Sequence, residues 1–207
     1  MGSRILLVRH GHTGWNEGAE EKFRGRADID LDALGVRQAE ATAARISRWD
    51  VAAIYSSPLP RAMTTARILA SSLNIEPGAD NGLIDIDYGT WQGLSLGQAQ
   101  TQGPQLYSQW LESPHLALFP SGEGLEQVRS RVVAAVENVL SYHTEQTIVL
   151  VSHKVVCKVL MGVFLGLELS HFWHIEQHTC AINQVDVKPL APIVTLLNDT
   201  SHLQGVE

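Results

Sequence analysis

The sequence contains few cysteines and no excess of basic residues. Cys157 and Cys180 are its two cysteines, too few for the disulfide framework of a small secreted domain, and they favour a reducing compartment. With 15 lysines and arginines against 22 aspartates and glutamates, the formal net charge is −7. A protein that binds nucleic acid or an acidic membrane usually presents a basic surface, so we expect neither of these partners.

Long apolar runs are also lacking. No stretch approaches the span of a transmembrane helix, and the residues before Arg9 have neither the length of a signal-peptide core nor a cleavage motif, which predicts a cytoplasmic location. We find no internal repeat and no low-complexity tract. The chain has 207 residues, of which 44% are hydrophobic and 18% charged, and we expect residues 1–207 to form a single globular domain.

Short aliphatic runs alternate with helical patterns along the chain. This alternation predicts an α/β fold, a three-layer α/β/α sandwich with a mostly parallel central sheet. The segment at about 80–120 contains several Gly, Gln and Pro residues and is predicted to form loops and short helices, as a lid or specificity segment. The predicted strands are 5–8, 51–55 and 148–151, with edge strands at 182–187 and 193–197, and the predicted helices are 31–49, 62–73 and 125–139, the last with Ser121 as its N-cap.

Polar residues follow each of the three predicted internal strands. Arg9 and His10 follow the first, Arg61 lies shortly after the second, and His153 follows the third. Because ligands of parallel α/β sheets bind at the carboxyl ends of the strands, we expect these four side chains to converge on one crevice. Arginine matches phosphate oxygens with bidentate hydrogen bonds, whereas two arginines would oppose a metal cation. The pattern therefore predicts a phosphate site.

A metal site elsewhere is an alternative that we consider and do not favour. His171 and His174 are one helical turn apart, and His178 follows them. Beyond Glu168 and Glu176, no nearby cysteine or carboxylate completes a set of metal ligands. We therefore expect no metal and no cofactor.

Three ordered motifs resemble the histidine phosphatase (phosphoglycerate-mutase-like) superfamily. The first is Leu7–Thr13, followed by Trp15 and Asn16; the second is Ser56–Ala62; the third is Val151–His153. Together they make a chance match very improbable, and the resemblance extends from about residue 4 to 203. In overall appearance the chain is most similar to the branch of metal-independent phosphoserine phosphatases and broad-specificity phosphatases.

The resemblance implies a role for each matching residue. His10 would attack phosphorus and become phosphorylated, while Arg9, Arg61 and His153 surround the phosphoryl oxygens. An imidazole is nucleophilic when neutral, and a hydrogen bond at one ring nitrogen selects the other as the nucleophile. The general acid would be Asp85, where most relatives of this type carry Glu. We also expect phosphate or substrate binding by Thr13, Asn16, Gly25, Tyr88 and Lys154.

Some positions depart from the family pattern. Asp85 is one methylene shorter than Glu, and Asp87 is an alternative acid. Tyr88 stands where phosphoserine phosphatases of this type carry His, which argues against phosphoserine as the substrate. Lys154 follows His153 where relatives often have a small or uncharged residue, and it would bind a second anionic group if its side chain enters the cleft.

The resemblance implies a metal-independent phosphatase that hydrolyses a small phosphorylated metabolite through phosphohistidine. A phosphoglycerate-type phosphomutase is one alternative, although the stretch before Pro120 is shorter than the insertion that such mutases carry. A catalytically weak protein that binds a phosphorylated ligand is another. Members of the family are often dimers, and the sequence leaves a homodimer as one alternative. It does not identify the physiological substrate.

Overall fold

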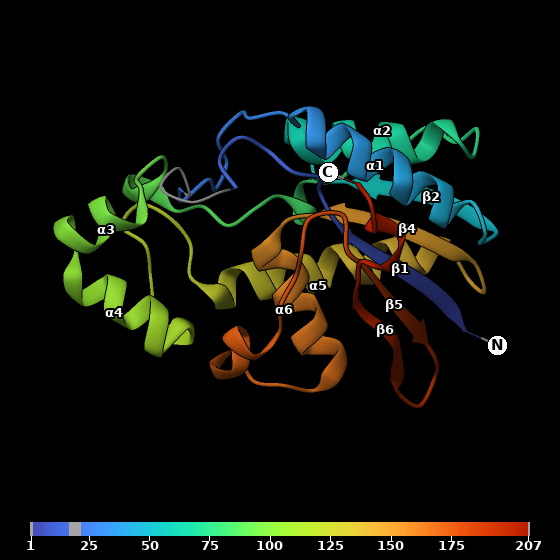
Figure 1. Cartoon of the computed structure of the whole chain (residues 1–207). Coiled ribbons are helices and arrows are strands. Elements are labelled where there is room, and N and C mark those ends of the chain that lie inside the picture. Colours follow the sequence, from blue (N-terminus) through green and yellow to red (C-terminus); the bar gives the residue numbers. More distant parts are fainter. Residues whose placement is uncertain (1, 17–21, 207) are drawn as a thin grey trace.

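The computed structural model describes residues 2–16 and 22–206 and contains one six-stranded sheet (Figure 1). Its strands are β1 (Ser3–Arg9), β2 (Val51–Ser56), β3 (Gly78–Ala79), β4 (Thr147–Ser152), β5 (Ile182–Val187) and β6 (Pro192–Asp199). They lie in the order β3-β2-β4-β1-β5-β6, and of these strands β5 alone runs in the direction opposite to the other five. The predicted α/β fold with a mostly parallel central sheet is confirmed.

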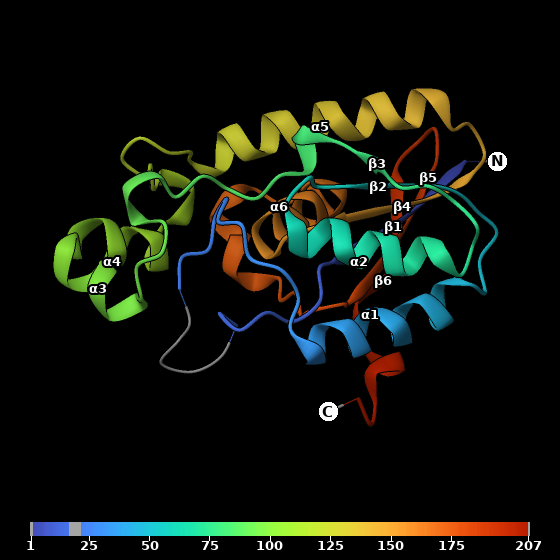
Figure 2. The same ribbon diagram turned by 90° about the horizontal axis from the view of Figure 1, so that it is seen from above.

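Helices cover both faces of the sheet because β1 and β4 are apolar on both faces. Leu6 and Val8 pack in the core beneath α1 and α2, whereas Ile5 and Leu7 pack in the core beneath α5 and α6 (Figure 2). Successive side chains of a strand point to opposite faces, so an unbroken apolar run requires a cover on each. The helices are α1 (Ala33–Ile46), α2 (Pro60–Ser71), α3 (Leu96–Gln102), α4 (Pro104–Glu112), α5 (Leu125–Tyr142) and α6 (Lys154–Leu165).

Most ends of the predicted helices differ from the structure by two or three residues. The helix predicted at 31–49 is α1, which begins after the N-cap Asp32 and ends at Ile46. The prediction of Ser121 as the N-cap of α5 is wrong: its φ of 58° lies in the left-handed region, whereas an N-cap is extended. Gly124 is extended there, and its N–H donates to the side chain of Gln127.

The prediction that residues 182–187 form an edge strand is also wrong. β5 lies between β1 and β6, where Ile182 and Val185 are fully buried. Burying these two side chains in the sheet favours pairing with β1 over a position at the edge. β6 is the edge strand, as predicted for 193–197, and Pro192 begins it where a missing N–H is tolerated.

The segment between β3 and α5 leaves the sheet and carries α3 and α4, which lie beyond the carboxyl ends of the parallel strands (Figure 1). Among the described residues, no helix is long and apolar enough to cross a membrane. The short 3-10 helices are η2 (Asn81–Leu83), η3 (Gly89–Trp91), η4 (Pro114–Leu116), η5 (Leu169–His174) and η6 (Ser201–Leu203).

Candidate active site

The carboxyl ends of β1 and β4 bring two histidines together. Arg9 and Ser152 are register partners at the ends of these strands, and His10 and His153 follow them directly. The centroids of the two imidazole rings lie 5.2 Å apart. His153 is also the N-cap residue of α6, so the positive end of this helix dipole lies at the same edge of the sheet.

His10 is buried and held in one tautomer. Its Nδ1 lies 2.7 Å from the carbonyl oxygen of Gly11, so the ring proton is on Nδ1 and the lone pair is on Nε2. Burial, and then the positive charges of Arg61 and Arg9, hold the pKa of His10 well below its ordinary value. The imidazole is therefore neutral and nucleophilic at neutral pH.

Arg61 is fully buried at the start of α2. It donates to the carbonyl oxygens of Ala27 and Gly25 and, over 3.2 Å, to Oδ2 of Asp85. Its Nε is also buried and has no hydrogen-bond partner among the described residues. Burial lowers the pKa of Arg61, and the charge of Asp85 opposes this change.

Arg9 is held by a backbone carbonyl from a different part of the chain. Its Nη1 donates to the carbonyl oxygen of Gln177, whereas its buried Nε lacks a hydrogen-bond partner in the described part of the chain. Burial, followed by the neighbouring charge of Arg24, lowers the pKa of Arg9 to about 10, so the guanidinium stays charged at neutral pH. Buried donors of this kind are suited to the oxygens of an anion.

Asp85 lies against both Arg61 and His153. Its Oδ2 is 3.2 Å from Arg61 Nη2 and 3.7 Å from His153 Nδ1. Burial raises the pKa of Asp85 and outweighs the opposing charges of Arg61 and Arg24. A raised pKa favours the protonated carboxyl, the form that an acid catalyst needs.

Within the described ranges, no cluster of three histidine, cysteine, aspartate or glutamate side chains is placed to hold a metal ion.

Residues 5–200 match the sequence profile of the family described as histidine phosphatase superfamily (branch 1). The chain belongs to the histidine phosphatase superfamily.

Known proteins similar to this histidine phosphatase include both sequences and solved structures. Phosphoserine phosphatase 1 of Hydrogenobacter thermophilus is 34% identical over 200 residues, which are 97% of this chain and 94% of that protein. The structure of YhfR from Bacillus stearothermophilus matches with a TM-score of 0.92 and 29% identity, over 99% of this chain and 100% of that one. The mycobacterial glucosyl-3-phosphoglycerate phosphatase Rv2419c, in complex with VO3, matches with a TM-score of 0.87 and 26% identity, over 95% and 99% of the two chains. With these relatives, the protein is a phosphoric monoester hydrolase of this family.

The other predicted residues of this histidine phosphatase fall into two groups. Gly25, Tyr88 and Lys154 line one cavity together with His10 and Asp85. Asn16 instead accepts hydrogen bonds from the backbone N–H and the hydroxyl of buried Thr13. These two residues therefore stabilise the loop after His10. Neither of them is among the residues that line the cavity.

Of two further candidates from the sequence, Asp87 lies outside the cavity lining, whereas Lys154 is part of it. The carboxylate of Asp87 is 3.3 Å from Arg26 and accepts the backbone N–H of Gly89, so Asp85 is the carboxylate at the site. The ammonium of Lys154 does reach the cavity, but it lies 3.5 Å from the carboxylate of Glu176. His12 pairs with Asp32 across 2.5 Å, away from the cavity.

Arg24 is a site residue that the motifs did not predict. It lines the cavity beside His10, and its charge acts on the pKa values of His10, Arg9 and Asp85. Its Nη1 donates to the carbonyl oxygen of Trp15. Its position between the first motif and the first long helix was the only signal available in the sequence.

A buried amide pair holds the backbone that orients Arg9. Gln177 and Asn183, both fully buried, exchange two hydrogen bonds of 2.9 and 2.7 Å, and Asn183 also donates to the carbonyl oxygen of Leu7. The carbonyl of Gln177 is the acceptor for Arg9. Sequence analysis missed this pair because two amides six residues apart form no recognisable motif.

Proposed function

We propose that this protein hydrolyses a small phosphomonoester in two steps, with His10 as the transiently phosphorylated residue. Nε2 of His10 attacks phosphorus in line with the ester bond, which breaks. Arg9, Arg61 and His153 hold the nonbridging oxygens and offset their charge. The observation that carries the proposal is the hydrogen bond from Nδ1 of His10 to Gly11, because it leaves the lone pair on Nε2 of a neutral, buried imidazole.

Asp85 is the proton donor in the first step and the base in the second. Its carboxyl protonates the leaving oxygen; its carboxylate then takes a proton from the water that attacks phosphohistidine, which releases phosphate and restores neutral His10. The raised pKa of Asp85 and its place beside Arg61 and His153 support this role. These contacts support Asp85 as the acid even though its side chain is one methylene shorter than that of Glu.

The remaining assignments follow from the same cavity. Thr13 and Asn16 shape the loop that presents His10, while Gly25, Tyr88 and Lys154 border the leaving group. Residues 80–120 are the specificity segment of a single domain. The substrate is a small phosphorylated metabolite, and the two free, buried cysteines support a cytoplasmic location.

The test compares the wild type with His10→Ala in chelator, using an aryl phosphate and a panel of small phosphomonoesters. We expect hydrolysis by the wild type and a loss of roughly 10³-fold or more in the variant. Alkaline quenching should trap a phosphoenzyme in the wild type alone, because a phosphohistidine is stable to base and labile to acid. His174→Ala, which removes an exposed histidine outside the cavity lining, is the matched control.

The outcomes separate the alternatives. Hydrolysis that persists in His10→Ala would refute the phosphohistidine route. Transfer of the phosphoryl group to a second hydroxyl in place of water would identify a phosphomutase. Phosphate binding without turnover of any ester would identify a binding protein.

A further inference from the structure

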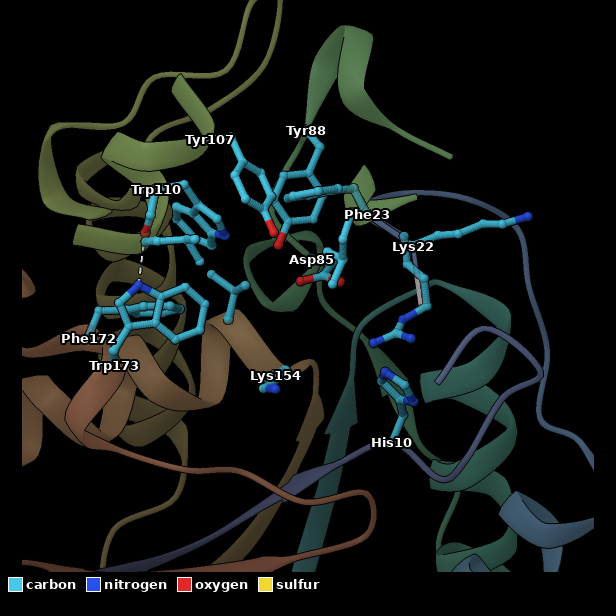
Figure 3. A pocket seen from close by; sticks show the side chains of 15 residues that line it. His10, Lys22, Phe23, Asp85, Tyr88, Tyr107, Trp110, Lys154, Phe172 and Trp173 are labelled. Atoms are coloured by element: carbon cyan, nitrogen blue, oxygen red, sulfur yellow. Dashed lines mark hydrogen bonds between the residues drawn. The ribbon is translucent and has the colours of Figure 1, made fainter. Parts of the chain in front are cut away.

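The cavity at His10 has two chemically different halves. Figure 3 shows His10 and Asp85 on one side and the rings of Trp110, Phe172 and Trp173 on the other, with Tyr88 and Tyr107 between them. The cavity volume is about 240 Å³. The phosphoryl group belongs with the buried cations beside His10, so the aromatic half receives the alcohol part of the ester.

The rings of the aromatic half are held by contacts with one another. Trp110 packs edge-on against Trp173 and tilted against Phe172, with ring centroids 5.3 Å apart in both pairs. The indole N–H of Trp173 donates to the carbonyl oxygen of Trp110 over 2.8 Å, as drawn in Figure 3. These contacts join α4 to η5, and a wall fixed in this way loses little side-chain entropy when a ligand packs against it.

The lysines at this cavity already have partners. Lys154 lies 3.5 Å from the carboxylate of Glu176, and the ammonium of Lys22 lies over the ring of Trp15, 4.7 Å from its centroid. A second anionic group on the substrate would have to compete with these contacts. Charge therefore gives the aromatic half little selectivity for phosphorylated acids, and the apolar surface dominates.

We propose that the substrates are phosphate monoesters of alcohols that carry one flat, apolar ring near the ester oxygen. This inference rests on the proposed function, since it assigns the alcohol part of the hydrolysed ester. An apolar cavity of about 150 Å³ holds one benzene ring. A volume of about 240 Å³ accommodates a phosphoryl group and one ring, and larger alcohols extend past half-exposed Leu111.

The first experiment measures kcat/KM of the wild type in chelator for benzyl phosphate, ethyl phosphate and phosphoserine. All three release a primary alkoxide, so the series varies the alcohol more than the need for an acid. Burying one ring should raise kcat/KM for benzyl over ethyl phosphate roughly 10- to 100-fold. Phosphoserine should fall near ethyl phosphate. Cyclohexylmethyl phosphate should lie above ethyl and below benzyl phosphate, because its ring is apolar but not flat.

Two leucines provide a matched pair of variants. Leu111 on α4 lines the cavity and is 50% exposed, whereas Leu116 in η4 is 59% exposed and is not part of the lining. Leu111→Ala should lower the benzyl-to-ethyl ratio of kcat/KM by about threefold to tenfold. Leu116→Ala should leave the ratio unchanged. Both side chains are half exposed, so neither truncation threatens the fold.

Three outcomes would overturn the proposal. A higher kcat/KM for phosphoserine than for benzyl phosphate would mean that charged groups select the substrate. Equal values for benzyl and ethyl phosphate, or equal effects of Leu111→Ala and Leu116→Ala, would mean that the aromatic half does not receive the alcohol. Each of these presupposes hydrolysis that depends on His10; failure to hydrolyse any ester would refute the proposed function itself.

Discussion

At the scale of single residues, hydrogen bonds decide which ring nitrogen of each buried histidine carries the proton. The Ser57 hydroxyl accepts the backbone N–H of Leu59 and lies 2.7 Å from Nε2 of His153. We infer that it donates to Nε2, which places the ring proton on Nδ1, 3.7 Å from Asp85. His153 then offers a donor where His10 offers a lone pair, so the two neighbouring imidazoles are suited to opposite tasks.

Replacing Asp85 by asparagine separates protonation from phosphate binding. Asp85→Asn keeps the shape of the side chain and removes its proton, so kcat for alkyl phosphates should fall by roughly 10²- to 10⁴-fold. An aryl leaving group hardly needs a proton, and its kcat should change far less. Steady-state assays with both esters measure the difference; an equal loss for both would show that Asp85 is not the acid.

The pH dependence of the wild type tests the same residue. Because burial raises the pKa of Asp85, its acid form persists to higher pH than that of an ordinary aspartate. Hydrolysis of alkyl phosphates should decline as pH rises through this raised pKa, whereas hydrolysis of aryl phosphates should decline less. Profiles of kcat against pH for the two esters check this, and profiles of identical shape would contradict it.

At the scale of elements, α5 holds the segment that carries Asp85. Arg131 on α5 donates to the carbonyl oxygens of Gly82, Ile84 and Asp85 and forms an ion pair of 3.0 Å with Glu123. The backbone carbonyls of this segment gain a defined hydrogen-bond donor in this way. Arg131 is therefore a positioning residue for the acid, although it lies outside the cavity lining.

Two arginines of α5 allow a matched test of this role. Arg131→Gln should lower stability by about 1–3 kcal/mol, because partly buried carbonyls lose their donor, and should reduce kcat for alkyl phosphates more than for aryl phosphates. Arg129→Gln removes an exposed ion pair with Glu126. It should change stability by no more than about 1 kcal/mol and should leave the alkyl-to-aryl ratio of kcat nearly unchanged. Denaturant unfolding and the alkyl-to-aryl ratio of kcat are the measurements. A uniform loss for both esters would indicate a purely structural role.

At the scale of the whole molecule, the positively charged site lies at one edge of the sheet in an otherwise acidic protein. The net charge of −7 contrasts with the cations Arg9, Arg24 and Arg61, which surround two buried histidines. Burial, followed by the charge of Arg61, holds the pKa of both His10 and His153 well below the ordinary value. Such depressed pKa values link the integrity of the site to the stability of the fold.

The linkage predicts a loss of stability on mild acidification. In the unfolded chain these histidines bind protons as pH falls through about 6.5, whereas in the folded protein they stay neutral to lower pH. The free energy of unfolding should therefore fall by up to about 1.4 kcal/mol per pH unit for each such histidine, from about pH 6.5 downward until the folded pKa is reached. Urea unfolding at several pH values measures the slope. His153→Gln should make it shallower, and an unchanged slope would contradict the assignment.

Much of the fold, and the grouping of Arg9, His10, Arg61 and His153, was predictable because short sequence patterns indicate both. The runs at 5–8 and 148–151 are long enough to define buried strands, and the polar residues after them mark the carboxyl edge of a parallel sheet. His10, Arg9, Arg61 and His153 were therefore predicted to meet, and the structure brings them together. Asp85, predicted from the family resemblance, lies at the same point.

Contacts between distant segments were beyond the sequence pattern. Ser121 has the chemistry of an N-cap, but the turn that contains it requires a left-handed backbone there; β5 takes an internal place because the sheet offers more burial than its edge. Arg131 reaches its three carbonyl acceptors only after α5 packs against residues 82–85.

The sequence by itself predicted the α/β class and the convergence of Arg9, His10, Arg61 and His153, because strand periodicity and short motifs act over a few residues. Only the tertiary structure decided which side chains form the aromatic half of the cavity. Tyr88, Trp110 and Trp173 come from segments up to 85 residues apart in number, and nothing in their spacing predicts one wall. Side-chain packing depends on how whole elements dock, and that depends on the burial of the entire core.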